Sequence, residues 1–291
     1  MLSVIQRPID NTAMNAYMTC PKEYQYSMVE HRRGRGRSPA LVFGSAWHAA
    51  MEAHYRTGGD LGKVAEAIYT KWEGHDSADD YRTVDRVLLE YNRYVAHWRP
   101  TDADFRSTLG YPDEPMVELA TNIAGGGLIH PYAGKLDRIY KEGGLTYIED
   151  HKTTSRLDKH YFSQYKLSNQ MKGYTFMGQQ LLPGEKVVGV RINLLHVLTN
   201  KSGFERQIFT FTPEEIQDWV ENTNRWTRRI ADDTATGDFP MHFGDNGCSR
   251  KFGMCQYHNV CSLSPRLRPK MLEREFDIHP WNPLEADTLE D

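Results

Sequence analysis

The spacing of apolar and polar positions divides the chain into helical and strand-forming segments. In several stretches the apolar residues recur every three to four positions, which is typical of helices packed on one face. From Met116 the spacing changes to the alternation of strands, and helices return later. The predicted helices cover residues 11–18, 40–57, 61–72, 79–98, 158–166, 168–182 and 212–235, and the predicted strands cover residues 117–123, 132–140, 145–152, 186–197 and 204–211. This order predicts an α/β (α+β) fold with a central mixed sheet flanked by helices.

Two of the predicted strands form a hairpin that carries charged residues. Gly143-Gly144 separates them and is a turn signal. Because side chains alternate between the two faces of a strand, Asp137 and Asp150 can face each other, and Lys152 shares the face of Asp150. Two carboxylates and an ammonium group at one point are costly unless a divalent cation lies between them. We interpret the hairpin as a metal-dependent phosphodiesterase centre, and a salt-bridged surface hairpin is the alternative.

Two predicted helices carry further candidate residues. His48 lies on the first of them, and Glu52, four residues later, shares its face and could orient it. Gln170 and Tyr174 are also four apart, on the helix over residues 168–182. Taken singly, a helical histidine is usually a satisfied core or surface residue, and a Gln/Tyr pair is typical of a half-buried helix face.

In their order, these motifs resemble the PD-(D/E)XK nuclease superfamily, and most of all its RecB-type exonuclease branch. His48 comes first, Asp137 ends a Gly-x-x-Asp strand, Asp150-His151-Lys152 supplies Asp-x-Lys, and Gln170-x-x-x-Tyr174 follows. The set spans about the first 175 residues. The resemblance implies a restriction-endonuclease-like core with a central mixed sheet.

The resemblance also implies a role for each residue. The expected ligands of Mg²⁺ or Mn²⁺ are the side chains of His48, Asp137 and Asp150 and the backbone carbonyl of His151, and the imidazole would favour Mn²⁺ somewhat. Lys152 would orient the attacking water or stabilise the charge on the phosphate. Gln170 and Tyr174 would border the site, where they touch the DNA strand or orient the catalytic lysine.

The four cysteines are unevenly placed: Cys20 stands alone near the start, and Cys248, Cys255 and Cys261 lie close together near the end. Structural zinc sites usually have paired C-x2-4-C motifs, which are missing here. The set resembles the cluster of four-cysteine RecB-type nucleases, phage or CRISPR-associated, in which four thiolates hold a [4Fe–4S] cluster. The sequence departs from the commonest form, which has C-x2-C within the triplet. Zinc is the second choice, and four unrelated buried cysteines are the alternative.

The length and composition of the chain indicate its domain organisation. With 291 residues, 39% hydrophobic and 25% charged, the chain is expected to be one nuclease domain over residues 1–291. Within it we expect a helical insertion over about 59–114, a cluster region formed by about 15–30 with 240–265, and a loosely packed tail over 266–291. The basic, glycine-rich stretch 31–37 is either a flexible loop or a phosphate-holding one.

The net charge of −4 does not exclude nucleic acid, because an enzyme needs a basic groove rather than a basic whole. We find no apolar run of membrane-spanning length and no signal-peptide core, so we expect a cytoplasmic protein, in the host cytoplasm if it is viral, with no membrane partner.

The resemblance implies that the function is that of a metal-dependent DNA exonuclease that prefers single-stranded ends. The resemblance places such enzymes in DNA recombination, repair, phage DNA processing or CRISPR spacer acquisition. A helicase or strand-annealing partner is expected, since we find no ATP-binding loop in the sequence. The alternative is a non-catalytic DNA-binding or complex-assembly subunit that retains the nuclease fold. The intact set of His48, Asp137, Asp150 and Lys152 argues against that alternative.

Overall fold

The structure is a computed structural model of the chain. It describes residues 5, 7–36, 38–74, 79, 81–243, 245–250 and 253–284. The chain divides into two compact units. The larger unit is made of Arg37–Leu119 and Lys135–Ile216, and the smaller unit of Met1–Gly36, Ala120–Gly134 and Gln217–Asp291. That the whole chain forms one nuclease domain stays a prediction.

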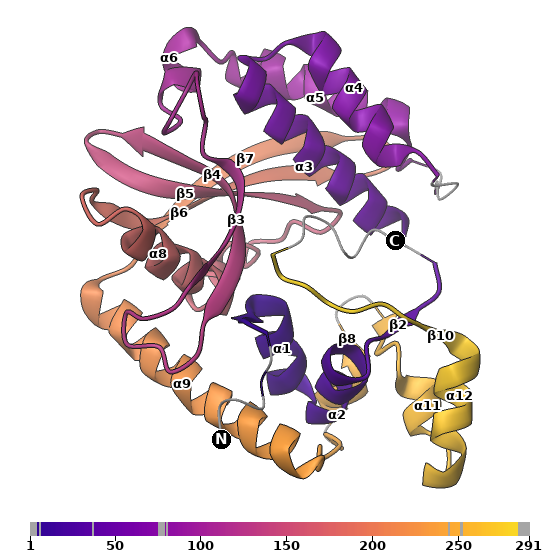
Figure 1. The fold of residues 1–291 in the computed structure, drawn as a ribbon. Helices are drawn as coiled ribbons and strands as arrows, with labels where there is room; N and C mark the ends of the chain where they lie inside the picture. The colour runs from indigo at the N-terminus through magenta and orange to yellow at the C-terminus, as the bar shows by residue number, and fades with distance from the viewer. Residues whose placement is uncertain are drawn as a thin grey trace. The chain divides into compact units, whose positions relative to one another are not determined.

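A mixed six-stranded sheet forms the framework, as predicted (Figure 1). Its strands follow the order β1-β4-β5-β6-β7, with β3 also paired to β4. The pairs β1–β4 and β5–β6 are parallel, whereas β4–β5 and β6–β7 are antiparallel. The strand bounds are β1 Ile9–Asp10, β3 Val117–Ile123, β4 Tyr132–Glu142, β5 Leu145–Thr154, β6 Val187–Val197 and β7 Ser202–Thr210.

In the larger unit, helices cover both faces of its part of the sheet (Figure 1). One face carries α3, α4 and α5, and the other carries α8. The helices of this unit are α3 Pro39–Thr57, α4 Leu61–Trp72, α5 Val84–Trp98, α6 Asp102–Arg106, α7 Ser163–Lys166 and α8 Asn169–Leu181. Helix α3 begins where Ser38 accepts a hydrogen bond from the N–H of Leu41 at 3.3 Å, and it ends at Gly58, whose φ of 64° suits glycine.

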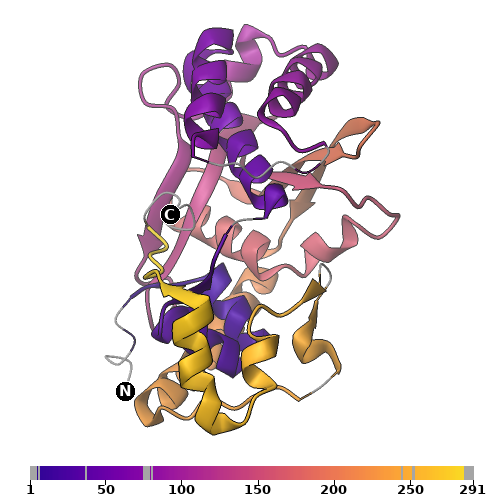
Figure 2. The same cartoon turned by 90° about the vertical axis from the view of Figure 1, so that its right-hand side faces the viewer.

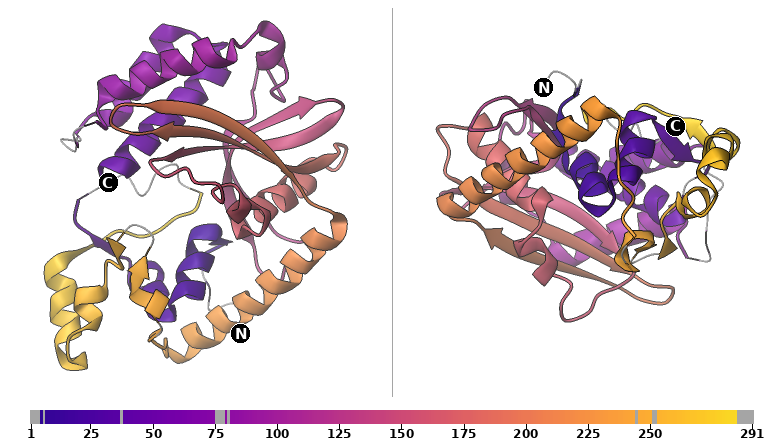
Figure 3. Two further views of the ribbon diagram at one scale, coloured as in Figure 1. Left: turned by 180° about the vertical axis from the view of Figure 1, so that it is seen from behind. Right: turned by 90° about the horizontal axis from the view of Figure 1, so that it is seen from below.

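The core of the larger unit explains why these helices form. On α3 and α5 the apolar residues recur at helical spacing and meet the sheet through large side chains. Trp47 and Tyr94 pack edge to face at 5.6 Å, and Phe204 of β7 stacks beside Trp47. On the opposite face, α8 approaches β5 closely, since a Cβ on Gly178 would lie 2.9 Å from Ile148. Figure 3 shows β6 and β7 as a long curved hairpin.

The smaller unit joins segments from the start, middle and end of the sequence (Figure 2). Its first apolar cluster includes Met14, Tyr17, Ile230 and Phe239, and its second includes Tyr26, Tyr257 and Leu272. The further elements are α1 Asn11–Thr19, α2 Pro21–Tyr24, a π-helical turn Gln25–Val29, β2 Arg32–Gly34, α10 Asp245–Cys248, β8 Ser249–Arg250, β9 Gly253–Met254, α11 His258–Cys261, a 3-10 turn Pro265–Leu267, α12 Arg268–Glu275 and β10 Phe276–Ile278. Helix α9, Pro213–Thr236, begins in the larger unit and continues into the smaller one.

Several local predictions were wrong. The tail is not loose over α12 and β10, because Leu272 and Phe276 are buried and β10 pairs with β2. The same pairing makes Arg32–Gly34 a strand rather than a flexible loop, while Arg37 lies outside the described residues. The helix expected from residue 79 begins at Val84, after the cap Thr83. Residues 285–291 of the tail also lie outside the described residues.

Candidate metal centre

The hairpin of β4 and β5 places two aspartates on one face of the sheet. Its register pairs Arg138 with Glu149, so Asp137 and Asp150 are the next residues along the two strands. Both are buried, with 4% of Asp137 and 1% of Asp150 exposed. Because neighbouring residues of a strand point to opposite faces, the aspartates and the Arg138–Glu149 pair face different sides. Buried carboxylates are costly unless they are paired or ligate a metal ion.

Asp137 is the point where β4, β5 and α3 meet. Its Oδ2 accepts a hydrogen bond from the backbone N–H of His151 at 2.7 Å, and it lies 3.3 Å from Nδ1 of His48 on α3. Small residues let α3 come this near, since a Cβ on Gly44 would lie only 3.4 Å from Oγ1 of Thr153. The predicted ligands His48 and Asp137 therefore lie together.

A further acid, Glu118 of β3, joins this group and was missed by the sequence analysis. Its Oε1 lies 3.7 Å from Nδ1 of His48, and its Oε2 lies 2.6 Å from Nζ of Lys135. His48, Glu118 and Asp137 offer ligand atoms that all lie within 4.8 Å of one another. This is the spacing that a single metal ion requires. Glu118 also has a φ of 52°, a conformation that non-glycine residues rarely adopt and that often marks functional sites.

The three groups shift one another's pKa. Burial and the nearby carboxylates of Glu118 and Asp150 raise the pKa of Asp137 to about 7, against the opposing effect of His48. Burial alone would lower the pKa of His48, but Asp137 and Glu118 raise it to about 9. For Glu118, burial is outweighed by the hydrogen bond and charge of His48 and by Lys135, so its pKa falls to about 2. A cation would take the place of the protons that this group holds.

The predicted lysine lies on the same face as Asp150. Nζ of Lys152 is 2.8 Å from one carboxylate oxygen of Asp150 and 3.0 Å from the other. It also donates to Oε1 of Gln170 at 3.2 Å, and Nε2 of Gln170 donates to the hydroxyl of Tyr174 at 3.0 Å. Burial would lower the pKa of Lys152, but Asp150 and Asp137 outweigh it and raise the pKa, so the amine is charged.

His151 points to the other face of the sheet. Its ring stacks on Tyr55 at 6.0 Å and is 1% exposed, and burial lowers its pKa to about 3. Neither ring nitrogen finds a hydrogen-bond partner among the described residues. Glu149 faces the same side and is held by Arg138 and Arg191, so it lies outside the group of acids around Asp137. The role expected for the backbone carbonyl of His151 stays a prediction.

Glu52 does not orient His48, contrary to expectation. Its carboxylate pairs instead with Arg56, one turn further along α3, at 2.8 Å. Glu118 takes the position beside His48 that the sequence analysis gave to Glu52. Helical spacing alone suggested Glu52, and it carried no information about β3.

The four cysteines all lie in the smaller unit, and all four are free thiols. The N–H of Cys255 donates to the carbonyl of Cys248 at 2.7 Å. Burial and the neighbouring Cys20, Cys255 and Cys248 raise the pKa of Cys261 to about 11. Within the described ranges, no three cysteine sulfurs lie within 4.8 Å of one another.

The model of the PD-(D/E)XK nuclease superfamily matches residues 11–262. The chain belongs to this superfamily. The match includes α3, the β4–β5 hairpin and α8, and thus every residue of the acidic group and its lysine. As a member of this superfamily, the chain has a restriction-endonuclease-like fold, and the matched range includes Asp150-His151-Lys152.

Two solved structures were found to be similar to this PD-(D/E)XK nuclease. A protein from Eubacterium rectale, titled "Putative exonuclease", superposes with a TM-score of 0.51 at 13% sequence identity, over 84% of this chain and 88% of that one. The structure of SSO0001 covers 88% of this chain and 95% of its own, at 13% identity and a TM-score of 0.31. The first likeness supports the fold, and the second is too low to carry an argument. No curated protein matches the sequence significantly.

The acidic group and the family agree on a metal-dependent nuclease. Hard carboxylate oxygens next to an imidazole are ligands that divalent cations accept. As for membranes, none of the helices that the structure describes has the length and apolar character needed to cross a bilayer.

Proposed function

We propose that the chain is a DNA exonuclease that hydrolyses phosphodiester bonds with Mg²⁺ or Mn²⁺ and prefers single-stranded ends. The observation that carries the proposal is the convergence of His48, Glu118 and Asp137 within single-ion distance, beside the Asp150–Lys152 pair. The exonuclease title of the Eubacterium rectale protein supports the mode of attack.

The donor set fits a divalent cation. We assign its ligands to the side chains of His48, Asp137, Asp150 and, newly, Glu118, together with the backbone carbonyl of His151. Asp137 is held for this task by the N–H of His151, which fixes one of its oxygens. When bound, the cation would supply Lewis-acid stabilisation of the charge that builds on the phosphate.

Lys152 acts beside the acids as a fixed positive charge. Its contact with Asp150 keeps the amine protonated, so it can stabilise the developing oxyanion or orient the attacking water. Gln170 holds Nζ from α8, and Tyr174 in turn holds Gln170. We therefore assign Gln170 and Tyr174 the positioning of the lysine at the border of the site.

We further propose that Cys20, Cys248, Cys255 and Cys261 hold a [4Fe–4S] cluster, with zinc as the second choice. The fit rests on four free thiols in one unit. Cys261 lies near enough to the other three for their charges to raise its pKa. Four thiolates on one zinc ion would lie about 3.8 Å apart, as Zn–S bonds of about 2.3 Å in a tetrahedron require. Among the residues described, no three of the sulfurs come that near, so the preference for iron over zinc rests on the resemblance to four-cysteine RecB-type nucleases.

The setting of the activity belongs to the same proposal. We place the enzyme in the cytoplasm, or the host cytoplasm if it is viral, in DNA recombination, repair or phage DNA processing. A helicase or strand-annealing protein would supply the single-stranded ends. These assignments rest on the resemblance to RecB-type nucleases.

Digestion of end-labelled DNA tests the proposal. Single- and double-stranded substrates, labelled at either end, are incubated with the protein and Mn²⁺, and the products are sized. We expect labelled mononucleotides or short products from single strands, and more than about a hundredfold loss in Asp150→Ala and Lys152→Ala. Lys63→Ala, at the exposed surface of α4, is the matched control.

Circular dichroism and thermal melting must show that both variants remain folded. Unchanged cleavage by both would defeat the assignment of these residues. Wild-type protein that binds DNA but cleaves it with neither Mg²⁺ nor Mn²⁺ would instead indicate a non-catalytic DNA-binding or assembly subunit.

A further inference from the structure

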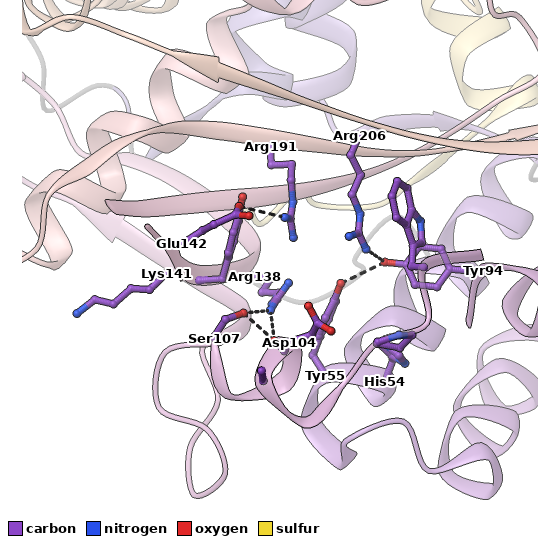
Figure 4. Close-up of a pocket in the computed structure, with 14 residues that line it drawn as sticks. His54, Tyr55, Tyr94, Asp104, Ser107, Arg138, Lys141, Glu142, Arg191 and Arg206 are labelled. Atoms are coloured by element: carbon purple, nitrogen blue, oxygen red, sulfur yellow. Dashed lines mark hydrogen bonds and ion pairs between the residues drawn. The ribbon is translucent and has the colours of Figure 1, made fainter. Parts of the chain in front are cut away.

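A polar cavity lies in the larger unit, on the sheet face opposite the aspartates. Its volume is about 170 Å³, enough for several water molecules or a tetrahedral oxyanion. Arg138, Arg191 and Arg206 reach it from β4, β6 and β7. Figure 4 shows their guanidinium groups pointing into the same space. Arg138 directly follows Asp137 in β4. The two side chains therefore point to opposite faces of the sheet, Arg138 into the cavity and Asp137 into the proposed metal centre.

The positive charge of this cavity exceeds the negative charge buried against it. Arg138 and Arg191 share a single buried carboxylate, that of Glu149, whose Oε1 lies 3.2 Å from Arg138. Glu142, 3.7 Å from Arg191, has a side chain that is 61% exposed and is therefore well solvated. Three guanidinium groups thus face one buried acid, Glu149, and two exposed acids, Glu142 and Asp104.

Arg206 is the one of these three arginines for which the described residues show no ion pair. Its NH2 donates to the hydroxyl of Tyr94 at 2.7 Å, and its guanidinium lies 4.0 Å from the ring centre of Trp98. No carboxylate pairs with Arg206 in the part of the chain that the structure describes. This half-buried guanidinium is held by a hydroxyl and an aromatic face, with no carboxylate in direct contact among the described residues.

Three polar atoms at this cavity also lack hydrogen bonds. They are Nε of Arg206, Nε1 of Trp98 and the hydroxyl of Tyr140, each buried and without a partner among the described residues. Arginine and tryptophan nitrogens can only donate, and the tyrosine hydroxyl can donate. Tyr140 is 1% exposed, so water outside the fold does not satisfy it. The missing partner must therefore accept hydrogen bonds.

The phenol and imidazole side chains around the cavity add no negative charge. Burial raises the pKa of Tyr140, and burial together with Glu149 raises that of Tyr55 well above its usual value, so both phenols are neutral. Burial and Arg138 lower the pKa of His54 to about 4, so this imidazole is neutral as well. The unpartnered donors of Arg206, Trp98 and Tyr140 thus remain without an acceptor among the described side chains.

We propose that this cavity binds a small oxyanion, a phosphate group above all, between Arg206, Tyr140 and Trp98. Guanidinium groups bind phosphate through paired charge-assisted hydrogen bonds, and the two neutral donors complete the shell. The group can come from free inorganic phosphate or from a nucleotide. The site is separate from the metal centre, and it does not depend on the proposed nuclease activity.

Binding of inorganic phosphate in the presence of EDTA tests the proposal. We expect calorimetry to show one bound phosphate, and the melting temperature to rise with phosphate concentration. Arg206→Met should weaken binding by about tenfold or more, because a charge-assisted bond is lost, and Tyr140→Phe should weaken it by a smaller factor. Arg225→Met, on the exposed surface of α9, is the control and should bind like the wild type.

Two further variants and ligands separate the alternatives. Asp150→Asn should keep the phosphate affinity, because it alters only the metal centre; a loss would move the binding there and overturn the proposal. If Arg206→Met fails to fold, Tyr140→Phe, which keeps the ring, decides the matter. A deoxynucleoside 5′-monophosphate that binds more tightly than phosphate identifies a nucleotide as the source, and equal affinity identifies free phosphate. No melting shift in the wild type, or equal shifts in wild type and both cavity variants, would overturn the site.

Discussion

Glu118 adds a carboxylate to the proposed metal centre, and no pattern in the sequence around it predicted this role. Because its side chain lies beside His48 and within single-ion distance of Asp137, Glu118→Gln should lower the affinity for Mn²⁺ by about 10–100-fold. Calorimetric titration with Mn²⁺ measures this directly. The control is Glu52→Gln on α3, whose carboxylate pairs with Arg56, and which should leave the affinity unchanged. Equal effects of the two changes would exclude Glu118 as a ligand.

The affinity for Mn²⁺ should also depend on pH. Asp137, with a pKa raised to about 7, and His48, with a pKa raised to about 9, must both lose a proton before they can ligate a cation. The apparent affinity should therefore rise with pH from about 6 to about 9, by at most tenfold per unit for each proton released, and then level off. Titrations at several pH values check the profile. His48→Gln should leave only the proton of Asp137 to be released, so the rise should not exceed tenfold per pH unit, and a profile that is flat in the wild type would contradict the assignment.

At the scale of residues, the sequence predicted what alternation along a strand determines. Asp137, Asp150 and Lys152 follow from two strands and one turn, and the structure places Lys152 against Asp150. Glu118 could not be found in this way, because its place depends on the pairing of β3 with β4 and on a backbone φ of 52°. Neither feature leaves a local pattern. Glu52 was chosen on helical spacing, which says which residues share a face but not what that face meets.

At the scale of elements, the β6–β7 hairpin supports the strand that carries Asp150. β6 pairs with β5, and Gly189 of β6 lies so close to β7 that a Cβ would come 1.9 Å from the carbonyl oxygen of Phe209. Gly189→Ala should therefore cost about 2 kcal/mol or more in the free energy of unfolding, because backbone rather than a flexible side chain must move. Urea unfolding measures the change. Gly203→Ala, in the same hairpin, meets nothing within 4 Å and should cost far less; equal costs would refute the explanation.

Most elements were predictable because their signals are local. Caps, turns and apolar periods located α3, α8 and every strand of the central sheet except β1 to within a few residues. The elements that were missed depend on distant partners. β2 pairs with β10, more than 240 residues later, and neither has a strong pattern of its own. α12 was taken for a loose tail because its few apolar residues, including Leu272, are stabilised by the cluster around Tyr257.

At the scale of the whole molecule, the proposed cysteine cluster would connect the start of the chain with its end. A cluster held by Cys20 and the three late cysteines would close a loop of more than 220 residues, which removes much entropy from the unfolded chain. We expect protein purified without oxygen to contain iron and acid-labile sulfide. Cys20→Ser and Cys261→Ser should each lose both and melt at a lower temperature. Ser262→Ala, next to Cys261, is the control.

The metal content decides between the cofactors. One zinc ion per chain and no iron would contradict the iron–sulfur assignment, although the thiols would still hold a metal. A wild-type chain that contains neither metal, and melts at the same temperature as the serine variants, would leave the cysteines as unrelated buried thiols. Composition and net charge could not have resolved this question, because they are ordinary for a globular protein.

The central claim is that one dication sits among acidic side chains from β3, β4 and β5 and an imidazole from α3. Anomalous diffraction from crystals soaked in Mn²⁺ tests it most directly, because manganese scatters anomalously and the protein's carbon, nitrogen and oxygen hardly do. We predict a strong anomalous peak within about 2.0–2.6 Å of ligand atoms of His48, Glu118 and Asp137, the range of hard-cation bonds, with Asp150 as a further ligand. A well-ordered crystal with no peak at this position, or with the only peak elsewhere, would contradict the account.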